Sequence, residues 1–451
     1  MQSIFSKDLG GFNDYPPVKN DLEVDIAIVG GGAAGLLCAY HLSKLGLKAT
    51  VFEANKIVAG TTAHSTAVLT ALQSPMYDRL KKKNEHAKEF LASQKEALEM
   101  YESIVDKYGI DCDFEYKPAY LFASNIDGDK AYNNKQHKIL TKEYEALKAL
   151  GANVEFTNSQ FGKAIKLDNQ AQINIVKFLA KLPKDFDIYE GTRIVDFILD
   201  EGLLKTAKGF NIKAKKVVIA TRFPVILSEF YFIKEYQEKS YVVAFKHPKL
   251  DATYCGTADN GLYMRSYGDY MLLGGLDHRT GMHDKDFDYF EKLASIAKKM
   301  FGVDPSNIEY KWSSMDAMTF DITPFAGALS KKHTDAYVIT GFNEWGILNS
   351  MICSRVVANS IATVPDRFSQ VFSVRRPYVG KNLGKMLPHA CVAVGGLTVG
   401  LFQGKMRCSH IGCGLRYNKL ENIYECPCHG SQYDTSGNLI GGPAVRGVVI
   451  K

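Results

Sequence analysis

The chain has 451 residues, of which 46% are hydrophobic and 23% are charged, and its formal net charge is +6. This length allows two or three domains, and the composition is typical of a soluble globular protein rather than a disordered or fibrous one. The positive charge is not gathered in one tract, so we expect no nucleic-acid partner.

The first predicted unit, residues 24–53, is a strand, a glycine turn, a helix and a second strand. Gly30 permits the tight turn, Gly32 lets the backbone approach a pyrophosphate, and Gly35 allows the helix to pack closely on the strand. Glu53 ends the second strand, at a position where a carboxylate can accept hydrogen bonds from the ribose hydroxyls of an adenosine. The turn and the start of the helix consist of Gly30, Gly31, Gly32, Ala33, Ala34 and Gly35. This motif predicts a dinucleotide site without separating FAD from NAD.

Three later segments are predicted to complete that site. Residues 59–66 are small or carry hydroxyls, as expected of a segment that runs along the cofactor. Residues 216–221 form a strand that ends in small residues, and residues 336–340 form a strand that enters a glycine loop and then a helix to about Ala362. A dinucleotide fold that begins near residue 24 and has its other pieces scattered over hundreds of residues is the pattern of flavoproteins, so amides at that helix N-terminus would face the flavin pyrimidine. The candidate cofactor contacts here are Ala54, Gly60, Thr61, Thr62, His64, Ala220, Thr221, Gly341, Trp345, Gly346 and Ile347.

Together these segments resemble the FAD-dependent D-amino-acid-oxidase-like superfamily (glycine and sarcosine oxidase type) over about residues 22–363. The resemblance implies bound FAD and an amine or amino-acid-like substrate. In relatives that oxidise methylated glycines, a histidine at the place of His64 bonds covalently to the flavin methyl group. The alternative is a histidine that only packs or hydrogen-bonds near the ring, since the chain lacks the aromatic residue that precedes this histidine in those relatives.

The segments between the flavin-binding pieces are predicted to form a substrate domain. Residues 76–107 and 130–150 have helical periodicity, and three strands near residues 241–245, 262–266 and 270–275 predict an antiparallel sheet over the flavin. The candidates for substrate contact are Arg265, His278, Asp316 and Trp345, of which Arg265, His278 and Trp345 are predicted as catalytic. Arg265 lies among apolar neighbours, so it pairs with either an anionic ligand or an internal carboxylate.

Four of the nine cysteines lie in the last 44 residues, in the patterns Cys408-Ser-His410-Ile-Gly-Cys413 and Cys426-Pro-Cys428-His429. Two thiolates and two neutral imidazoles are the ligands of a Rieske [2Fe-2S] centre, with Cys408 and Cys426 on one iron and His410 and His429 on the other. The alternative, a structural Cys2His2 zinc site, leaves Cys413 and Cys428 without a role.

This region resembles the C-terminal Rieske domain of respiratory cytochrome complexes and of flavoproteins that carry one as an extension. The resemblance implies that Cys413 pairs with Cys428 in a disulfide. The domain is short, so we expect some strands of the usual small β fold to be missing or supplied by the larger domain.

The predicted fold is therefore α/β (α+β): a Rossmann-like FAD-binding domain interleaved with an antiparallel-sheet substrate domain, followed by a small all-β Rieske domain. An oxidoreductase domain spans residues 1–365, a linker residues 366–385 and the Rieske domain residues 386–451. The FAD-binding parts are residues 22–75, 155–225 and 316–363, and the substrate parts are residues 76–154 and 226–315.

The predicted function is an FAD-dependent oxidoreductase, a dehydrogenase of an amine or amino-acid-like reductant, that passes electrons to the Rieske cluster and on to a redox protein or a quinone-like acceptor. The alternative is a flavin and iron-sulfur carrier or redox sensor with a protein partner and no small-molecule substrate. A third possibility, oxygen activation, is disfavoured because no mononuclear iron motif is evident.

The N-terminus has no basic region followed by an apolar run, and the apolar stretch at residues 391–402 is too short to cross a bilayer. The other five cysteines are scattered, as suits reduced thiols. We therefore expect a cytoplasmic protein without a transmembrane segment.

Overall fold

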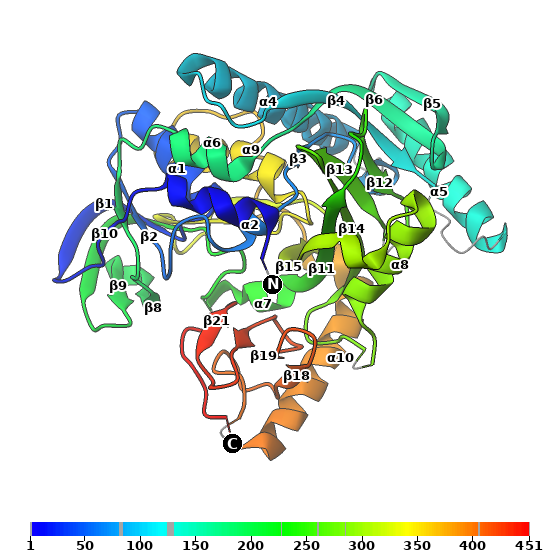
Figure 1. Ribbon diagram of the computed structural model, residues 1–451. Coiled ribbons are helices and arrows are strands. Elements are labelled where there is room, and N and C mark those ends of the chain that lie inside the picture. The colour runs from blue at the N-terminus through cyan, green and yellow to red at the C-terminus, as the bar shows by residue number, and fades with distance from the viewer. Residues whose placement is uncertain are drawn as a thin grey trace.

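The computed structural model describes residues 2–80, 84–123, 130–226, 228–258, 261–284, 286–404 and 406–450. Figure 1 shows three regions: a sheet with its helices on the left, a second sheet at the upper right, and the C-terminal strands with one long helix below. The predicted α/β fold with a small C-terminal β domain is confirmed.

The first sheet has a parallel centre. In the described residues its order is β16-β17-β10-β1-β2-β7, with β9 beside β10 and β8 beside β9. Its strands are β1 (Leu22–Val29), β2 (Ala49–Phe52), β7 (Asp187–Tyr189), β8 (Ile194–Ile198), β9 (Leu203–Thr206), β10 (Asn211–Ile219), β16 (Phe325–Ala328) and β17 (Ala336–Thr340). The apolar run in β1 becomes fully buried toward its end because neighbours cover both faces there.

Helices α1 (Ala33–Lys44) and α9 (Gly346–Ile361) pack against each other beside this sheet. Both are apolar around most of their circumference, which is typical of helices enclosed on more than one side. Both helix N-termini point at the carboxyl ends of parallel strands, where ligands bind in open α/β sheets.

The second sheet is larger and mixed. Over the described ranges its order is β15-β11-β14-β13-β12-β4-β6-β3, with β5 beside β6. Its strands are β3 (Val68–Leu69), β4 (Glu115–Phe122), β5 (Val154–Ser159), β6 (Gly162–Gln172), β11 (Glu235–Lys246), β12 (Thr253–Gly256), β13 (Tyr263–Tyr267), β14 (Tyr270–Arg279) and β15 (Ile308–Thr319). The three predicted strands are neighbours in it, as β11, β14 and β13.

Two details differ from the sequence prediction. The pair β12 and β4 is parallel, so the sheet is not purely antiparallel. Strands β5 and β6 belong to this sheet, although residues 155–225 were assigned to the FAD-binding part. The alternation of apolar and polar residues shows which face of a strand is buried, but it does not show which neighbouring strand it pairs with. That pairing depends on the tertiary fold.

The remaining helices cover the sheets or connect their strands. They are α2 (Thr61–His64), α3 (Tyr77–Leu80), α4 (Asn84–Tyr108), α5 (Lys130–Ala149), α6 (Ile175–Lys181), α7 (Tyr231–Lys234) and α8 (Tyr289–Phe301), and a 3-10 helix spans Ile4–Gly11. Helix α8 shows how such elements are specified. The Asp288 carboxylate accepts hydrogen bonds from two amides of the first turn, Gly302 ends the helix, and Phe290 and Leu293 are buried against β11 and β14.

The C-terminal domain consists of four short antiparallel strands, counted over the described residues: β18 (Arg416–Asn418), β19 (Ile423–Glu425), β20 (Gln432–Tyr433) and β21 (Leu439–Gly441). The preceding helix, α10 (Val379–Gln403), lies beside them and reaches the lower end of the molecule in Figure 1.

Helix α10 corrects two expectations. It begins inside the predicted linker and continues into the predicted Rieske domain, where a β structure was expected. It is also, of the helices in the described parts of the chain, the one long and apolar enough to cross a membrane by length and composition. The argument that the apolar stretch is too short was therefore wrong, because the stretch continues into a helix of 25 residues.

Candidate functional site

One cavity of about 1190 Å³ connects the carboxyl ends of the first sheet, the inner face of the second sheet and the C-terminal domain. The structure brings every predicted cofactor residue except Gly35 to its wall. A cavity of this size, lined by one glycine turn and two helix N-termini, can hold a dinucleotide.

The glycine turn requires its glycines for steric reasons. Gly30 has φ +114°, and a Cβ atom there would lie 2.4 Å from the Ala220 carbonyl oxygen. A Cβ at Gly35 would lie 1.9 Å from the carbonyl oxygen of Gly30. Gly35 therefore acts by closing the helix on the strand, which explains why it does not reach the cavity wall.

The carboxylate of Glu53 is fixed beside the glycine turn at the cavity wall. It accepts hydrogen bonds from the amides of Gly31 and Asn55, both at 2.8 Å. Burial raises the pKa of Glu53, and these two hydrogen bonds act in the opposite direction. The group is held at the end of β2, where the sequence predicts contact with ribose hydroxyls.

His64 is the last residue of α2 and lines the cavity. Its Nδ1 atom lies 2.8 Å from the Gly60 carbonyl oxygen, and the indole of Trp312 donates a hydrogen bond to the His64 carbonyl at 2.9 Å. These contacts fix the backbone and one ring nitrogen of His64 at the cavity wall. The covalent link to flavin stays a prediction.

The predicted substrate contacts divide into two groups. Asp316 and Trp345 line the cavity, whereas Arg265 and His278 are absent from its wall. Arg265 is buried and donates to backbone carbonyls, including those of Ala67 at 2.9 Å and Ile173 at 3.1 Å. Among the described residues its hydrogen-bond acceptors are backbone carbonyls rather than the internal carboxylate that was weighed from the sequence. The ring of His278 lies 3.0 Å from the Tyr241 hydroxyl, away from the cavity.

Of the carboxyl groups that line the cavity, four lie close enough to affect one another's ionisation: Glu238, Asp277, Asp316 and Glu344. Burial and the neighbouring carboxylates raise the pKa of Asp277 and of Glu344. Burial also raises the pKa of Asp316 to about 6, although the nearby Arg222 guanidinium partly offsets this. Such a group of acids favours a cationic ligand, because a cation would stabilise the ionised forms.

The sequence reasoning found only Asp316 of these four. Glu238 could have been found from the two-residue period of a strand. Along β11, Tyr236 and Glu238 point to one face and Gln237 and Lys239 to the other, so the period places Glu238 on the same face as Tyr236. Asp277 and Glu344 belong to different elements that meet only in the folded chain, and they carry no comparable sequence signal.

The second part of the site is built from two loops that fold alike. In the first, the Cys408 amide donates to the Cys413 carbonyl at 2.8 Å and the Gly412 amide donates to the Cys408 carbonyl at 2.9 Å. In the second, the Cys426 amide donates to the Ser431 carbonyl at 2.8 Å and the Gly430 amide donates to the Cys426 carbonyl at 2.9 Å. Both glycines have positive φ, so the repeated Cys-x-x-x-Gly spacing produces two equivalent turns.

The four predicted metal ligands come from these loops. The imidazoles of His410 and His429 lie with ring centroids 5.1 Å apart, and both Nδ1 atoms are buried without a hydrogen-bond partner in the described residues. Burial lowers the pKa of His410 to about 4 and that of His429 to about 3, which favours the neutral imidazole that binds metal. Two orphaned imidazole nitrogens on the same two loops as the thiols of Cys408 and Cys426 fit a Rieske cluster.

The predicted disulfide between Cys413 and Cys428 is present. It links the two ligand loops directly. The sulfurs of Cys413, Cys426 and Cys428 lie within 4.8 Å of one another, but the disulfide leaves only Cys426 of these three as a thiolate donor.

Strand β11 separates the cavity from the cluster loops. Tyr236 and Glu238 line the cavity on one face. On the other face, Gln237 donates to the His429 carbonyl, and the ammonium of Lys239 contacts the carboxylates of two residues in the C-terminal domain. Because side chains alternate along a strand, one strand connects the two parts of the site.

The C-terminal domain also closes the cavity itself. Gln432, Gly441 and Gly442 form part of its wall. Close by, Arg279 at the end of β14 donates to the Pro427 carbonyl at 3.0 Å and to the Cys428 carbonyl at 2.9 Å, and it contacts His389 of α10. Since His389 lines the cavity, Arg279 joins the cavity wall to the loop that carries Cys426.

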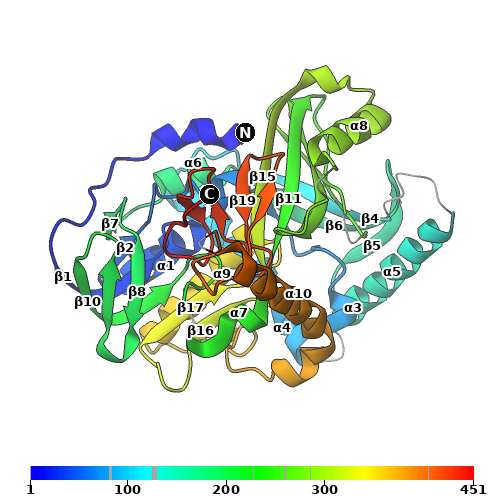
Figure 2. The same cartoon turned by 90° about the horizontal axis from the view of Figure 1, so that it is seen from below.

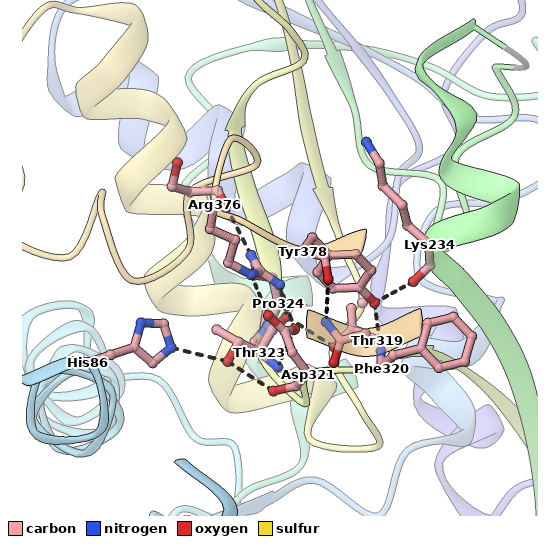
Figure 3. Close-up of polar contacts among 12 residues, drawn as sticks. His86, Lys234, Thr319, Phe320, Asp321, Thr323, Pro324, Arg376 and Tyr378 are labelled. Atoms are coloured by element: carbon pink, nitrogen blue, oxygen red, sulfur yellow. Dashed lines mark hydrogen bonds and ion pairs between the residues drawn. The ribbon is translucent and has the colours of Figure 1, made fainter. Parts of the chain in front are cut away.

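The connector between the two domains is anchored rather than loose (Figure 3). Arg376 forms a bidentate contact with Asp321, at 2.7 and 2.9 Å, and both side chains are largely buried. The Tyr378 hydroxyl donates to the Lys234 carbonyl at 2.6 Å and accepts from the Phe320 amide at 2.7 Å. The sequence left open whether this segment is a rigid strap or a tether, and these contacts make it a strap.

Comparisons with known proteins agree with this two-part site. Residues 25–360 match the family model of FAD dependent oxidoreductases (DAO), and residues 400–450 match that of the Rieske [2Fe-2S] domain.

Three relatives illustrate the match. The chain is 27% identical to YhfW of Bacillus subtilis (strain 168), a protein named for a Rieske 2Fe-2S iron-sulfur centre, with 96% of this chain and 94% of the relative covered. It is 24% identical to gamma-glutamylputrescine oxidoreductase of Escherichia coli (strain K12), with 79% and 88% covered. Glycine oxidase from Geobacillus kaustophilus has the same fold, with a TM-score of 0.63, 20% identity, and 79% of this chain and 99% of that chain covered.

Proposed function

The chain belongs to the FAD dependent oxidoreductase family and ends in a Rieske [2Fe-2S] domain, and from this premise we propose that it dehydrogenates an amine and passes the electrons to its own cluster. Its cofactors are FAD and a [2Fe-2S] cluster. When bound, the flavin accepts two electrons from a substrate, whereas the cluster carries one at a time.

The observation that carries the substrate class is the group of four cavity carboxyls, Glu238, Asp277, Asp316 and Glu344. They would bind the substrate as an ammonium ion. Oxidation to an imine removes a hydride from carbon and requires an unprotonated nitrogen, so a nearby carboxylate must take up the ammonium proton. Asp316, whose pKa is raised to about 6, is suited to accept that proton. The E. coli relative named for gamma-glutamylputrescine supports an amine as the substrate.

For the cluster, we propose that Cys408 and Cys426 hold one iron and that His410 and His429 hold the other. The cluster loops and the cavity share β11, Arg279 and the residues from Gln432 to Gly442, which supports transfer within one chain. We further propose a redox protein or a quinone-like molecule as the final acceptor.

Anaerobic titration of the holoprotein with candidate amines tests the proposed activity. Bleaching of the flavin absorbance by an amine is the expected result. Reduction only by a protein donor would instead support an electron carrier without a small-molecule substrate.

Replacing Glu344 with glutamine should weaken amine binding. A bound ammonium ion favours the ionised form of Glu344, and glutamine keeps the shape of the side chain but cannot carry that charge. Loss of a charged hydrogen bond of about 1.5–3 kcal/mol raises the KM for the amine roughly 10-fold to 100-fold. Glu309→Gln, an exposed carboxyl change on β15, is the matched control and should leave the KM unchanged. An unchanged KM in Glu344→Gln would remove Glu344 from the binding site.

The pH dependence follows from the pKa of Asp316. A carboxyl group with a raised pKa is neutral below that pKa and binds a cation only when ionised. Since the pKa of Asp316 is about 6, amine affinity should rise as pH increases through this value. The KM measured across that range checks the direction, and an affinity that falls with rising pH would contradict it.

Replacing Arg279 with glutamine should lower the reduction potential of the cluster. The guanidinium is a positive charge that donates to the Pro427 and Cys428 carbonyls, and its loss disfavours the added electron. Arg279→Lys keeps the charge and should stay near the wild-type potential. A potentiometric titration followed by EPR measures both variants, and equal potentials in all three proteins would refute this role.

A further inference from the structure

Helix α10 presents an apolar stripe to solvent. The stripe consists of Leu383, Leu387, Ala390, Val394, Leu397 and Leu401, which recur every three or four residues and therefore share one face. Val394 is 63% exposed, Leu401 is 73% exposed, and the neighbouring Phe402 is 87% exposed. A contiguous apolar surface of this kind on a folded protein marks an interaction site.

The opposite side of α10 is fixed to the C-terminal domain. A Cβ atom at Gly396 would lie 2.6 Å from the Cys428 sulfur, and one at Gly400 would lie 2.0 Å from the Gly412 carbonyl oxygen. The Gly414 amide also donates to the Gly396 carbonyl at 2.7 Å. The helix therefore cannot rotate to bury its stripe, and it cannot cross a bilayer while it keeps these contacts.

The charge of the surrounding chain selects the partner. Residues 367–420 contain nine lysines and arginines and no aspartate or glutamate. Exposed cations flank the stripe in sequence on both sides, with Arg375 and Lys381 before it and Arg407 and Arg416 after it. A second copy of the chain would bring two such basic segments together, which charge repulsion disfavours. The surface of an anionic membrane accepts apolar side chains and attracts cations, so it matches both the apolar stripe and the basic residues around it.

We propose that α10 is a membrane-surface anchor that binds anionic phospholipid, with its stripe inserted at the headgroup boundary and the basic residues against the lipid phosphates. The anchor holds the Rieske domain at the bilayer surface, and it does not depend on which substrate reduces the flavin.

Co-sedimentation of the full-length holoprotein with vesicles tests the anchor. The probes are vesicles of phosphatidylcholine alone and of phosphatidylcholine with a third phosphatidylglycerol. We expect binding to the anionic vesicles that weakens with added salt, and little binding to the neutral ones. Leu387→Glu and Leu401→Glu should each lower the vesicle partition coefficient by about tenfold or more, since each places a charge where the anchor would insert an apolar side chain into the membrane.

Leu45→Glu is the matched control, because Leu45 is also an exposed leucine but lies at the end of α1. It should bind vesicles like the wild type, and flavin and cluster absorbance should show that all variants are folded. Absence of vesicle binding, equal binding to neutral vesicles, or a dimer in solution that Leu387→Glu dissociates would each overturn the anchor.

Discussion

Replacing Lys239 with methionine should detach the Rieske domain from the flavin-binding part of the chain. Lys239 is fully buried on β11, and its ammonium contacts the carboxylates of Glu421 and Glu425, which are also buried. Methionine would leave both carboxylates in a low-dielectric interface without a cation, at a cost of about 3–5 kcal/mol. We expect the Rieske domain to separate from the flavin-binding part at a lower denaturant concentration. We also expect slower electron transfer to the cluster.

Chemical denaturation and rapid-mixing kinetics measure these two effects. Lys246→Met is the control on the same strand, because Lys246 is exposed and lies 3.8 Å from Glu309, a contact worth about 0–1 kcal/mol. Adding Glu421→Gln and Glu425→Gln to Lys239→Met should restore part of the stability, since no uncompensated charge then remains. A Lys239→Met protein that unfolds and transfers electrons like the wild type would show that this ion cluster does not hold the domain.

Replacing Cys408 with serine should abolish the cluster and leave the flavin half of the reaction intact. Serine keeps the loop geometry but removes a thiolate donor, so the iron site loses one of its proposed ligands. The amine should still bleach the flavin in a single turnover, because Cys408 lies outside the flavin-binding parts of the cavity. Steady-state turnover with a one-electron acceptor should fall to background.

Cys391→Ser is the matched control, since Cys391 is an exposed cysteine on α10 without a proposed ligand role. Iron content, EPR and turnover should all stay at the wild-type level in that variant. Full turnover in Cys408→Ser would mean that electrons leave the flavin directly and that the cluster is not on the path.

Local chain geometry explains why much of the site could be predicted. The Gly30 turn and the two cluster loops are specified by residues close in sequence, and each needs glycine where the backbone has positive φ or a Cβ would clash. Their chemistry is therefore visible as motifs.

Contacts between distant segments could not be predicted in the same way. Lys239 and Glu425 are in contact although 186 positions separate them in the sequence, and no residue next to either one indicates the other. Helix α10 was divided between a linker and a β domain, because the polar, proline and glycine content before Lys385 is typical of a connector and the resemblance to Rieske domains implies a β fold after it. Its glycines and Pro388 also lower helix propensity. Packing of Gly396 and Gly400 against the cluster loops overrides that local preference.

Anaerobic rapid mixing of the holoprotein with an amine that bleaches the flavin tests the central claim most directly. Flavin absorbance and the EPR signal of the reduced cluster are followed at several protein concentrations. Transfer within one chain predicts that the cluster signal follows flavin bleaching with a rate independent of protein concentration. A cluster that stays oxidised while the flavin is reduced, or a rate proportional to protein concentration, would contradict it.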